Sequence, residues 1–345
     1  MKATIKDVAR LAGVSIKTVS RVINREDSVK PDTEKKVQAA IDELNYQPNS
    51  SARNLAASQS FAIGYVYDNP NAYYVIDMQN GILKECQANG FELIIHPCDA
   101  SKEDIIDEIK MMIRRSQLAG LVLSPPLSEM PHVLEELDEI GVNYVRIVSG
   151  SKKQKEGKPC VFINDREASY KITHHLTELE HKRIAFITGD KDHQSTGERL
   201  QGFKSALKDS GIKLDPKLVI DGKYSFEAGV EGAKTLLSMK KPPSAIFACN
   251  DEIAAGALFA ARLMNVEVPG QLAIAGFEDN PFSRQTWPKL TTAAQPTSLI
   301  AKKAASTLIK AIKSVRKGDN EKVPHQYFEP ELVVRESTKE SENNA

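Results

Sequence analysis

The sequence has few of the features that mark secreted, membrane or zinc-binding proteins. Its four cysteines lie far apart and form no C-x-x-C pair, which argues against a disulfide scaffold or a zinc ribbon. No apolar run approaches the ~18–20 residues that a membrane helix needs. The segment after Met1 also lacks the apolar stretch of a signal peptide. We therefore expect a cytoplasmic protein with reduced thiols and no membrane partner.

The sequence also lacks the motifs of the common enzyme classes. It contains no G-x-x-x-x-G-K-[ST], no G-x-G-x-x-G after a predicted strand, no G-x-S-x-G and no H-E-x-x-H. The seven histidines are scattered along the chain, so neither a zinc site nor a catalytic triad is indicated. We therefore expect no catalysis, no metal and no cofactor.

The chain has no net charge, because 46 basic and 46 acidic residues balance, but the charges are unevenly distributed. Residues 1–25 carry six lysines and arginines against one acidic residue, Asp7. A basic segment on a neutral protein is typical of a polyanion-binding module, although a short basic run can also be ordinary solvated surface. The length of 345 residues allows two domains of about 150 residues and a small third.

Three short helices are predicted in the N-terminal segment. Thr4 and Asp7 have the spacing of a capping box that opens the first helix. Gly13 can take the positive φ of a tight turn, and Ser15 can cap a second helix over 16–24. A third helix follows. Two short helices joined by a tight glycine-containing turn are typical of a helix-turn-helix module.

The second predicted helix has an apolar and a polar face. Its apolar residues recur at helical spacing, and the opposite face carries side chains that can hydrogen-bond to base edges in the major groove. These polar residues are Lys17, Ser20, Arg21 and Asn24. Ile16 lies near the apolar stripe but at the end of the helix that would point into the groove, so its role stays open here. A purely structural three-helix bundle is the alternative interpretation.

A polar, small-residue segment over 46–60 separates this module from the rest of the chain and is typical of a domain boundary. Beyond it, strands and helices alternate. Strands are predicted at 61–66, 91–95, 119–123, 143–148, 160–163, 183–187, 217–221, 244–248 and 272–276. Helices are predicted over 73–89, 165–180, 197–209, 226–238 and 250–264, among others. About nine strands suit two doubly wound parallel sheets better than one.

Two long motifs in the first 56 residues are highly specific. The predicted helix-turn-helix contains TIKDVARLAGVS at 4–15 and TVSRVIN at 18–24, and the following segment contains NYQPNSSARNLA at 45–56. These motifs resemble the head and hinge of the lactose-repressor (LacI/GalR) family of bacterial transcription regulators, and the similarity continues to about residue 337. The resemblance implies a homodimer that binds double-stranded palindromic operator DNA.

The resemblance also implies which residues contact DNA. Ile16, Lys17 and Arg21 occupy the principal base-reading positions, Thr18 a phosphate-contacting position, and Leu55 the position that inserts into the minor groove at a central CpG step. Such a wedge partly unstacks a base step and opens the groove. The full set of expected DNA contacts is Thr4, Ser15, Ile16, Lys17, Thr18, Ser20, Arg21, Asn24, Asn49, Ala52, Leu55 and Ala56.

The domain boundaries follow from the same resemblance. We expect a helix-turn-helix domain at 1–47, a hinge helix and linker at 48–60, an effector-binding and dimerisation domain at 61–337, and a disordered polar tail at 338–345. The third of these is expected to be periplasmic-binding-protein-like, with one subdomain at about 61–160 plus 292–322 and the other at about 161–291 plus 323–337. The tail has no heptad pattern, which argues against a coiled-coil tetramer.

Ligands of open α/β sheets bind beyond the carboxyl ends of the strands, and the segments that follow the predicted strands are rich in aromatic, amide, arginine and carboxylate side chains. Aromatic rings stack on the CH faces of a sugar, and planar polar groups bind its hydroxyl pairs. This combination predicts a sugar-binding site at one edge of the sheets.

The segments RLQGF at 199–203, ACND at 248–251 and GFED at 276–279 resemble the effector-domain motifs of the family. The positions implied to contact effector are Tyr73, Tyr74, Ser124, His193, Ser195, Arg199, Tyr224, Asn250 and Glu278. The family more often has Asp where Glu278 stands. Val148 stands where some sugar-binding relatives place a carboxylate, and Arg146 on the same strand is a candidate to replace it.

We therefore expect a homodimeric transcription repressor of carbohydrate-utilisation genes that a sugar or glycoside releases from its operator, associated with the nucleoid. Three alternatives stay open. The ligand could be a sugar phosphate or purine-like co-repressor that tightens DNA binding, because Tyr224 could stack on a base. The chain could also be a stand-alone sugar receptor, or an enzyme with a regulatory head.

Overall fold

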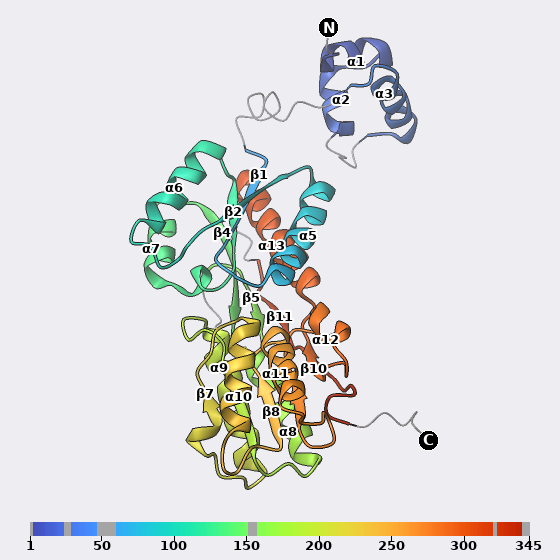
Figure 1. The fold of residues 1–345 in the computed structure, drawn as a ribbon. Helices are drawn as coiled ribbons and strands as arrows, with labels where there is room; N and C mark the ends of the chain where they lie inside the picture. The colour runs from blue at the N-terminus through green and yellow to red at the C-terminus, as the bar shows by residue number, and fades with distance from the viewer. Residues whose placement is uncertain (1–2, 24–28, 47–59, 151–156, 320–322, 340–345) are drawn as a thin grey trace. The chain divides into compact units, whose positions relative to one another are not determined.

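The computed structural model describes residues 3–23, 29–46, 60–150, 157–319 and 323–339 (Figure 1). The chain divides into two compact units, Met1–Phe61 and Ala62–Ala345. We call these units the head and the body and describe each by itself. No helix among the described residues combines the length and the apolar character needed to cross a membrane.

The head consists of three helices, α1 (Ile5–Ala12), α2 (Ile16–Ile23) and α3 (Pro31–Glu43). The predicted capping box is confirmed, because the Thr4 amide donates to the Asp7 carboxylate at 3.0 Å. Gly13 adopts the predicted left-handed conformation with φ 66°. Small apolar side chains from all three helices form the core, which contains Val8, Ala9, Val19, Val22, Val37 and Ala40.

The first subdomain of the body is built on a six-stranded parallel sheet with the order β11-β5-β4-β3-β1-β2. Helices α5 and α13 pack against each other on one side of this sheet, and α6 and α7 lie on the other (Figure 1). The strands are β1 (Ala62–Tyr67), β2 (Glu92–Pro97), β3 (Gly120–Leu123), β4 (Asn143–Ser149), β5 (Cys160–Ile163) and β11 (Gln326–Phe328). The helices are α5 (Ala72–Asn89), α6 (Ile105–Ser116), α7 (Pro131–Glu139) and α13 (Thr297–Lys317).

The second subdomain has a four-stranded parallel sheet with the order β7-β6-β8-β9. Helix α8 packs against α9, and α10 packs against α11. The strands are β6 (Ile184–Ile187), β7 (Val219–Ile220), β8 (Ala245–Ala248) and β9 (Ala273–Ala275), beside an antiparallel pair of β10 (Thr292–Ala294) and β12 (Glu331–Val333). The helices are α8 (Asp165–Glu178), α9 (Gln194–Asp209), α10 (Phe226–Leu237), α11 (Asp251–Leu263) and α12 (Pro281–Gln285). The fold class predicted from the sequence is confirmed.

The expected subdomain boundaries are wrong at two places. Strand β11 pairs with β5 in the first sheet, so neither 161–163 nor 323–328 belongs to the second subdomain. Strand β10 pairs with β12, beside the β9 edge of the second sheet, where Ala275 bridges Thr291. Residues 292–294 therefore belong to the second subdomain and not to the first. These strands have only three residues each, too few to show a pattern of apolar spacing.

The expected disorder of the tail is wrong at its start. The hydroxyl of Thr338 lies 2.9 Å from the His175 ring and 2.7 Å from the Thr291 hydroxyl, and Thr338 is buried. Ser337, also buried, donates its hydroxyl to the Ile274 carbonyl. The start of the tail is therefore attached to the second subdomain by hydrogen bonds of short polar residues. An apolar sequence pattern does not reveal such an attachment.

Candidate functional site

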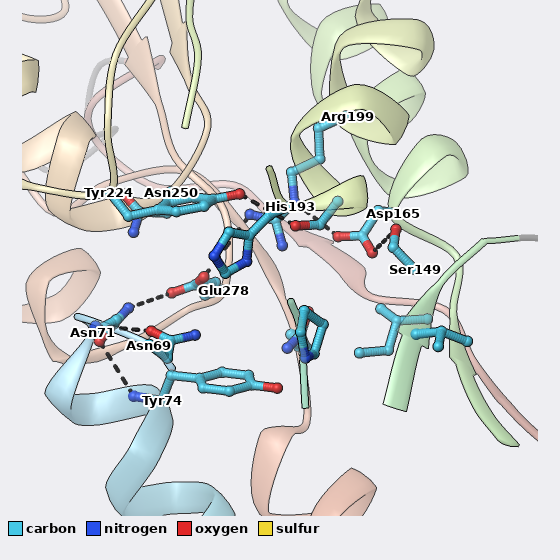
Figure 2. Close-up of a pocket in the computed structure, with 15 residues that line it drawn as sticks. Asn69, Asn71, Tyr74, Ser149, Asp165, His193, Arg199, Tyr224, Asn250 and Glu278 are labelled. Atoms are coloured by element: carbon cyan, nitrogen blue, oxygen red, sulfur yellow. Dashed lines mark hydrogen bonds and ion pairs between the residues drawn. The ribbon is translucent and has the colours of Figure 1, made fainter. Parts of the chain in front are cut away.

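A pocket lies between the two subdomains of the body, at the carboxyl ends of their strands (Figure 2). Its volume is about 40 Å³, whereas pockets that hold ligands usually measure roughly 300–1,000 Å³. A sugar ring therefore requires side chains or whole subdomains to move before it can enter. The lining residues are Asn69, Asn71, Tyr74, Pro125, Val148, Ser149, Ile163, Asp165, His193, Ser195, Arg199, Tyr224, Asn250, Glu278 and Gln295.

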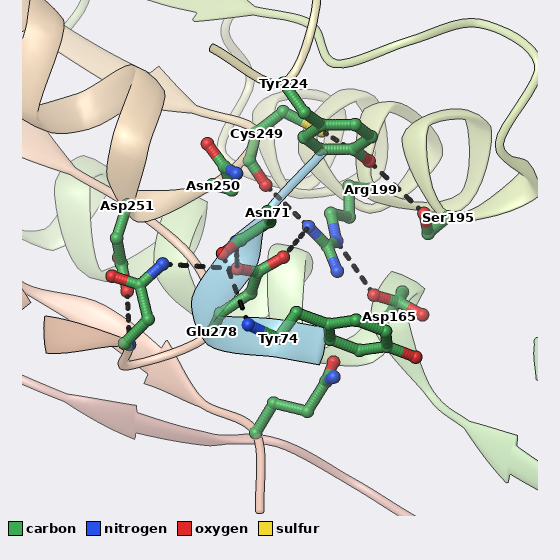
Figure 3. Close-up of polar contacts among 12 residues, drawn as sticks. Asn71, Tyr74, Asp165, Ser195, Arg199, Tyr224, Cys249, Asn250, Asp251 and Glu278 are labelled. Atoms are coloured by element: carbon green, nitrogen blue, oxygen red, sulfur yellow. Dashed lines mark hydrogen bonds and ion pairs between the residues drawn. The ribbon is translucent and has the colours of Figure 1, made fainter. Parts of the chain in front are cut away.

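Arg199, on α9, is the central cation of the pocket. Its Nε donates to Asp165 Oδ1 at 2.8 Å and its Nη1 donates to the Cys249 carbonyl at 2.7 Å (Figure 3). The guanidinium lies 3.7 Å above the centre of the Phe277 ring. Asp165 accepts a further hydrogen bond from the Ser149 hydroxyl at 2.6 Å. Arg199 is therefore held by a carboxylate, a carbonyl and a ring face.

Burial is the largest single influence on the pKa of Arg199 and lowers it, but Asp165 and other neighbouring groups, including Glu278, together raise the pKa above its ordinary value. Glu278 is the second carboxylate near this cation, with Oε1 3.9 Å from Arg199 Nη1. Burial raises the pKa of Glu278 to about 7, although Arg199 opposes that rise. The pocket thus holds one cation and two carboxylates, one of which titrates near neutral pH.

The loop that presents Glu278 has an unusual backbone. Glu278 has φ 103° and Asp279 has φ 56°, a region that side-chain-bearing residues seldom adopt. Asp251 holds this loop, since its carboxylate accepts from the Asn280 amide at 2.9 Å and from the Thr292 hydroxyl at 2.7 Å. A Cβ on Gly276 would lie 2.2 Å from Asp251 Oδ1, so glycine is required where the strand approaches this carboxylate.

Two aromatic residues shape the wall above Arg199. The Tyr224 hydroxyl lies 3.2 Å from the Ser195 hydroxyl and 2.9 Å from that of Thr196. The His193 ring meets the Tyr224 ring edge to face, with centroids 5.4 Å apart. Burial lowers the pKa of His193, which favours the neutral imidazole at pH 7. This wall is therefore uncharged and able to stack on a ring.

Two buried amide groups in the pocket have unused hydrogen-bonding atoms. Asn250 Nδ2 and Gln295 Oε1 are buried and have no partner, although Asn250 Oδ1 caps α11 by accepting from the Ile253 amide at 2.9 Å. Buried polar atoms are normally paired. One unpaired donor and one unpaired acceptor suit a ligand with hydroxyl groups, because a hydroxyl can both donate and accept.

The family models match both units of the chain. Residues 4–49 match the model of bacterial regulatory proteins of the lacI family, and residues 173–338 match a periplasmic binding protein-like domain. The ribose operon repressor of Haemophilus influenzae is 31% identical over 97% of this chain and 98% of its own length. The chain belongs to the lacI family.

Solved structures of family proteins share the whole fold. A complex of the transcriptional regulator CelR with cellobiose is 29% identical, with a TM-score of 0.73 over 97% of this chain and 100% of that chain. The lac repressor dimer bound to operator and the anti-inducer ONPF is 25% identical, with a TM-score of 0.76 over 98% of this chain and 99% of that chain. This lacI-family chain is therefore a DNA-binding transcription regulator with an effector-binding body, not an enzyme.

The structure brings seven of the nine predicted effector residues of this lacI-family body to the pocket and leaves two outside. Tyr73 does not line the pocket and instead packs edge to face against Phe282, with centroids 5.7 Å apart. Ser124 is fully buried and also lies outside the lining, where its neighbour Pro125 takes part. The seven lining residues are Tyr74, His193, Ser195, Arg199, Tyr224, Asn250 and Glu278.

Other residues line the pocket that the sequence does not predict, and Asp165 and Gln295 matter most among them. Asp165 lies two residues after the end of β5, so the rule that ligands bind beyond strand ends could have found it. Gln295 lies in the segment between β10 and α13, a crossing between subdomains that gives no signal in a single sequence. Val148 lines the pocket, but Arg146 does not replace the missing carboxylate, because its Nε donates to the Ser128 carbonyl at 2.6 Å.

In the head, the predicted DNA-contacting face lies opposite the buried Val19 and Val22. Ile16 is 45% exposed, which places it on the outer surface rather than in the core. Ser15 caps α2 by accepting from the Thr18 amide at 3.1 Å, and Lys17 is exposed. Asn24, Asn49, Ala52, Leu55 and Ala56 lie outside the described residues.

Proposed function

We propose that this chain is a cytoplasmic, nucleoid-associated homodimer that represses carbohydrate-utilisation genes and is released from a palindromic operator by an uncharged sugar or glycoside. The observation that carries this proposal is the neutralised Arg199. Its charge is matched by Asp165 at 2.8 Å and approached by Glu278 at 3.9 Å. A ligand that enters this pocket meets polar groups with no surplus positive charge.

The same observation argues against a sugar phosphate. Recognition of phosphate needs an available arginine, lysine or group of amide donors. Arg199 is the one arginine or lysine among the pocket-lining residues, and it is already engaged. The free donor of Asn250 and the free acceptor of Gln295 suit hydroxyl groups, and the similarity to a ribose operon repressor and to a CelR–cellobiose complex supports a carbohydrate effector.

We assign DNA reading to residues 1–47, with Ile16, Lys17 and Arg21 facing bases, and the hinge role to 48–60. The outer face of α2 supports this assignment, since Lys17 and Ile16 are exposed there. One recognition helix covers too few bases for specificity, so two copies must bind together. Exposed apolar side chains on α5 suit the contact between copies, and these are Tyr73, Ile76 and Leu83.

Fluorescence anisotropy tests this function directly. A CG-centred palindrome from upstream of the protein's own gene is titrated with the full chain, alone and with glucose, ribose, cellobiose and other mono- and disaccharides. The expected result is tight binding that one sugar abolishes. Tight binding that a ligand strengthens would support the co-repressor alternative, and equal affinity for a scrambled probe would contradict DNA-specific repression by this operator.

A further inference from the structure

Two asparagines, one from each subdomain, donate hydrogen bonds to the same carboxylate oxygen of Glu278. Asn71 Nδ2 donates to Glu278 Oε2 at 2.8 Å (Figure 3), and Asn280 Nδ2 donates to the same oxygen at 3.3 Å. Both asparagines are also helix N-caps, Asn71 for α5 and Asn280 for α12. Asn280 belongs to the same subdomain as Glu278, whereas Asn71 belongs to the other.

Asn71 uses every polar atom of its side chain in this arrangement. Its Oδ1 accepts from the amides of Tyr73 at 3.1 Å and Tyr74 at 3.2 Å, which fixes the first turn of α5. Its Nδ2 reaches across the pocket to Glu278, and the residue is 3% exposed. Because an amide group is planar and rigid, Glu278 cannot move far without turning Asn71 or breaking this hydrogen bond.

We propose that Asn71 is a positioning residue that couples the orientation of the Glu278 carboxylate to the first turn of α5. A ligand hydroxyl that takes over Glu278 Oε2 displaces the Asn71 amide and frees that turn. The same turn carries Tyr74 into the pocket and Tyr73 on the outer face of α5. The coupling rests on the proposed function only for its use by an effector, since the hydrogen bonds that form the link lie within the chain itself.

Hydrogen exchange of the ligand-free full chain, followed by mass spectrometry on peptides that cover 72–78, tests the link. Asn71→Ser keeps a side-chain acceptor for the cap but removes the donor to Glu278. We expect about tenfold faster exchange in this peptide, the size expected for losing a hydrogen bond to a charged group. Glu278→Ala should give the same increase, and the double variant should add nothing further.

Asn280→Ser is the matched control, because it removes the other donor to Glu278 Oε2 while keeping a side-chain acceptor for the cap of α12. We expect it to leave exchange over 72–78 unchanged. Two results would overturn the proposal. One is that the increases in exchange rate caused by Asn71→Ser and Glu278→Ala add up in the double variant. The other is that Asn280→Ser speeds exchange over 72–78 as much as Asn71→Ser does. Circular dichroism melting confirms that each variant is folded before exchange is compared.

Asn71→Asp separates coupling from capping, because aspartate caps helices as well as asparagine does. If Asn71 only caps α5, then Asn71→Asp should leave exchange over 72–78 unchanged. The link predicts loosening at pH 8, where two carboxylates repel, and recovery of protection at pH 5.5, where one of them holds a proton. Arg199, Asp165 and Glu252 also act on Glu278 and are the same in both proteins. Unchanged protection at pH 8 would refute the link whether or not DNA binding or a sugar effector is found.

Discussion

Arg199 and Asp165 form an ion pair that is almost completely shielded from solvent, with their side chains 5% and 1% exposed. The pair joins α9 to the first residue of α8, at the point where the chain passes from the first sheet to the second. Loss of one partner from such a pair leaves an uncompensated buried charge, which is more damaging than loss of both. The pocket and the stability of the second subdomain therefore depend on the same contact.

Asp165→Asn should destabilise the body strongly. The variant leaves the Arg199 cation buried without its main counter-charge, so we expect a loss of about 3 kcal/mol or more in the free energy of unfolding. Urea denaturation followed by circular dichroism measures the change. The matched control is Glu198→Gln, which breaks the pair with Arg166 whose side chain is 54% exposed, and we expect a loss below about 1 kcal/mol. Equal losses in the two variants would contradict the structure.

Two largely buried glutamates should lower the stability of the fold as the pH rises from about 4.5 to 8. Burial raises the pKa of both Glu278 and Glu129 to about 7, above the ordinary value of a glutamate. A group with a raised pKa in the folded protein stabilises it while protonated, and this contribution is lost as pH rises through the folded value. Burial lowers the pKa of His175, His181 and His193, so these histidines oppose the fall, because they bind protons more readily in the unfolded chain than in the folded protein.

Glu129 connects this pH dependence to the contact between the two subdomains. Its carboxylate accepts from the Ser149 amide at 3.2 Å in the first subdomain and from the Gln194 amide at 3.1 Å in the second. Glu129→Gln and Glu278→Gln should each flatten the slope of unfolding free energy against pH, measured in urea at several pH values. A slope that is the same in the wild type and in both variants would rule out these raised pKa values, because the histidines contribute equally to all three proteins.

Much of this molecule could be predicted from the sequence, because periodicity and strand ends carry most of the information. The apolar runs placed every long strand, and the rule on strand ends brought Arg199, Asn250 and Glu278 to one pocket. Gln295 and the edge strand β11 could not be found this way. Each lies at or beside a crossing between subdomains, where the position of a residue depends on tertiary pairing rather than on local pattern.

Tyr73 and Ser124 show the other limit of sequence reasoning. Both lie next to residues that line the pocket, but adjacent residues in a helix or loop point in different directions. Tyr74 faces inward while Tyr73 is 36% exposed and meets Phe282. A motif match fixes the segment that reaches a site, and only the three-dimensional path of the backbone decides which of its side chains enters.

Gly276→Ala should disturb the Glu278 loop indirectly, by displacing Asp251. The added Cβ would lie 2.2 Å from Asp251 Oδ1, so Asp251 must move and release Asn280 and Thr292. We expect a loss of about 2 kcal/mol, as for other overpacked cores, measured by urea denaturation. Gly197→Ala on α9 is the control, because its Cβ meets nothing within 4 Å, and alanine in a helix stabilises by up to about 1 kcal/mol. Similar destabilisation by both variants would contradict the close approach of Gly276 to Asp251.

Lys17→Gln should weaken binding of the CG-centred palindrome without unfolding the head. Lys17 is exposed on the outer face of α2, so its loss removes a DNA contact but no core packing, and a base contact of this kind contributes roughly 1–3 kcal/mol. Lys36→Gln changes a lysine on α3 that is also exposed and controls for net charge.

Anisotropy titrations over several salt concentrations distinguish two kinds of contact. Loss of preference over scrambled DNA indicates base reading, whereas uniform weakening with a salt slope smaller by about one indicates a phosphate contact. Equal affinities for the two lysine variants would show that α2 does not face the operator.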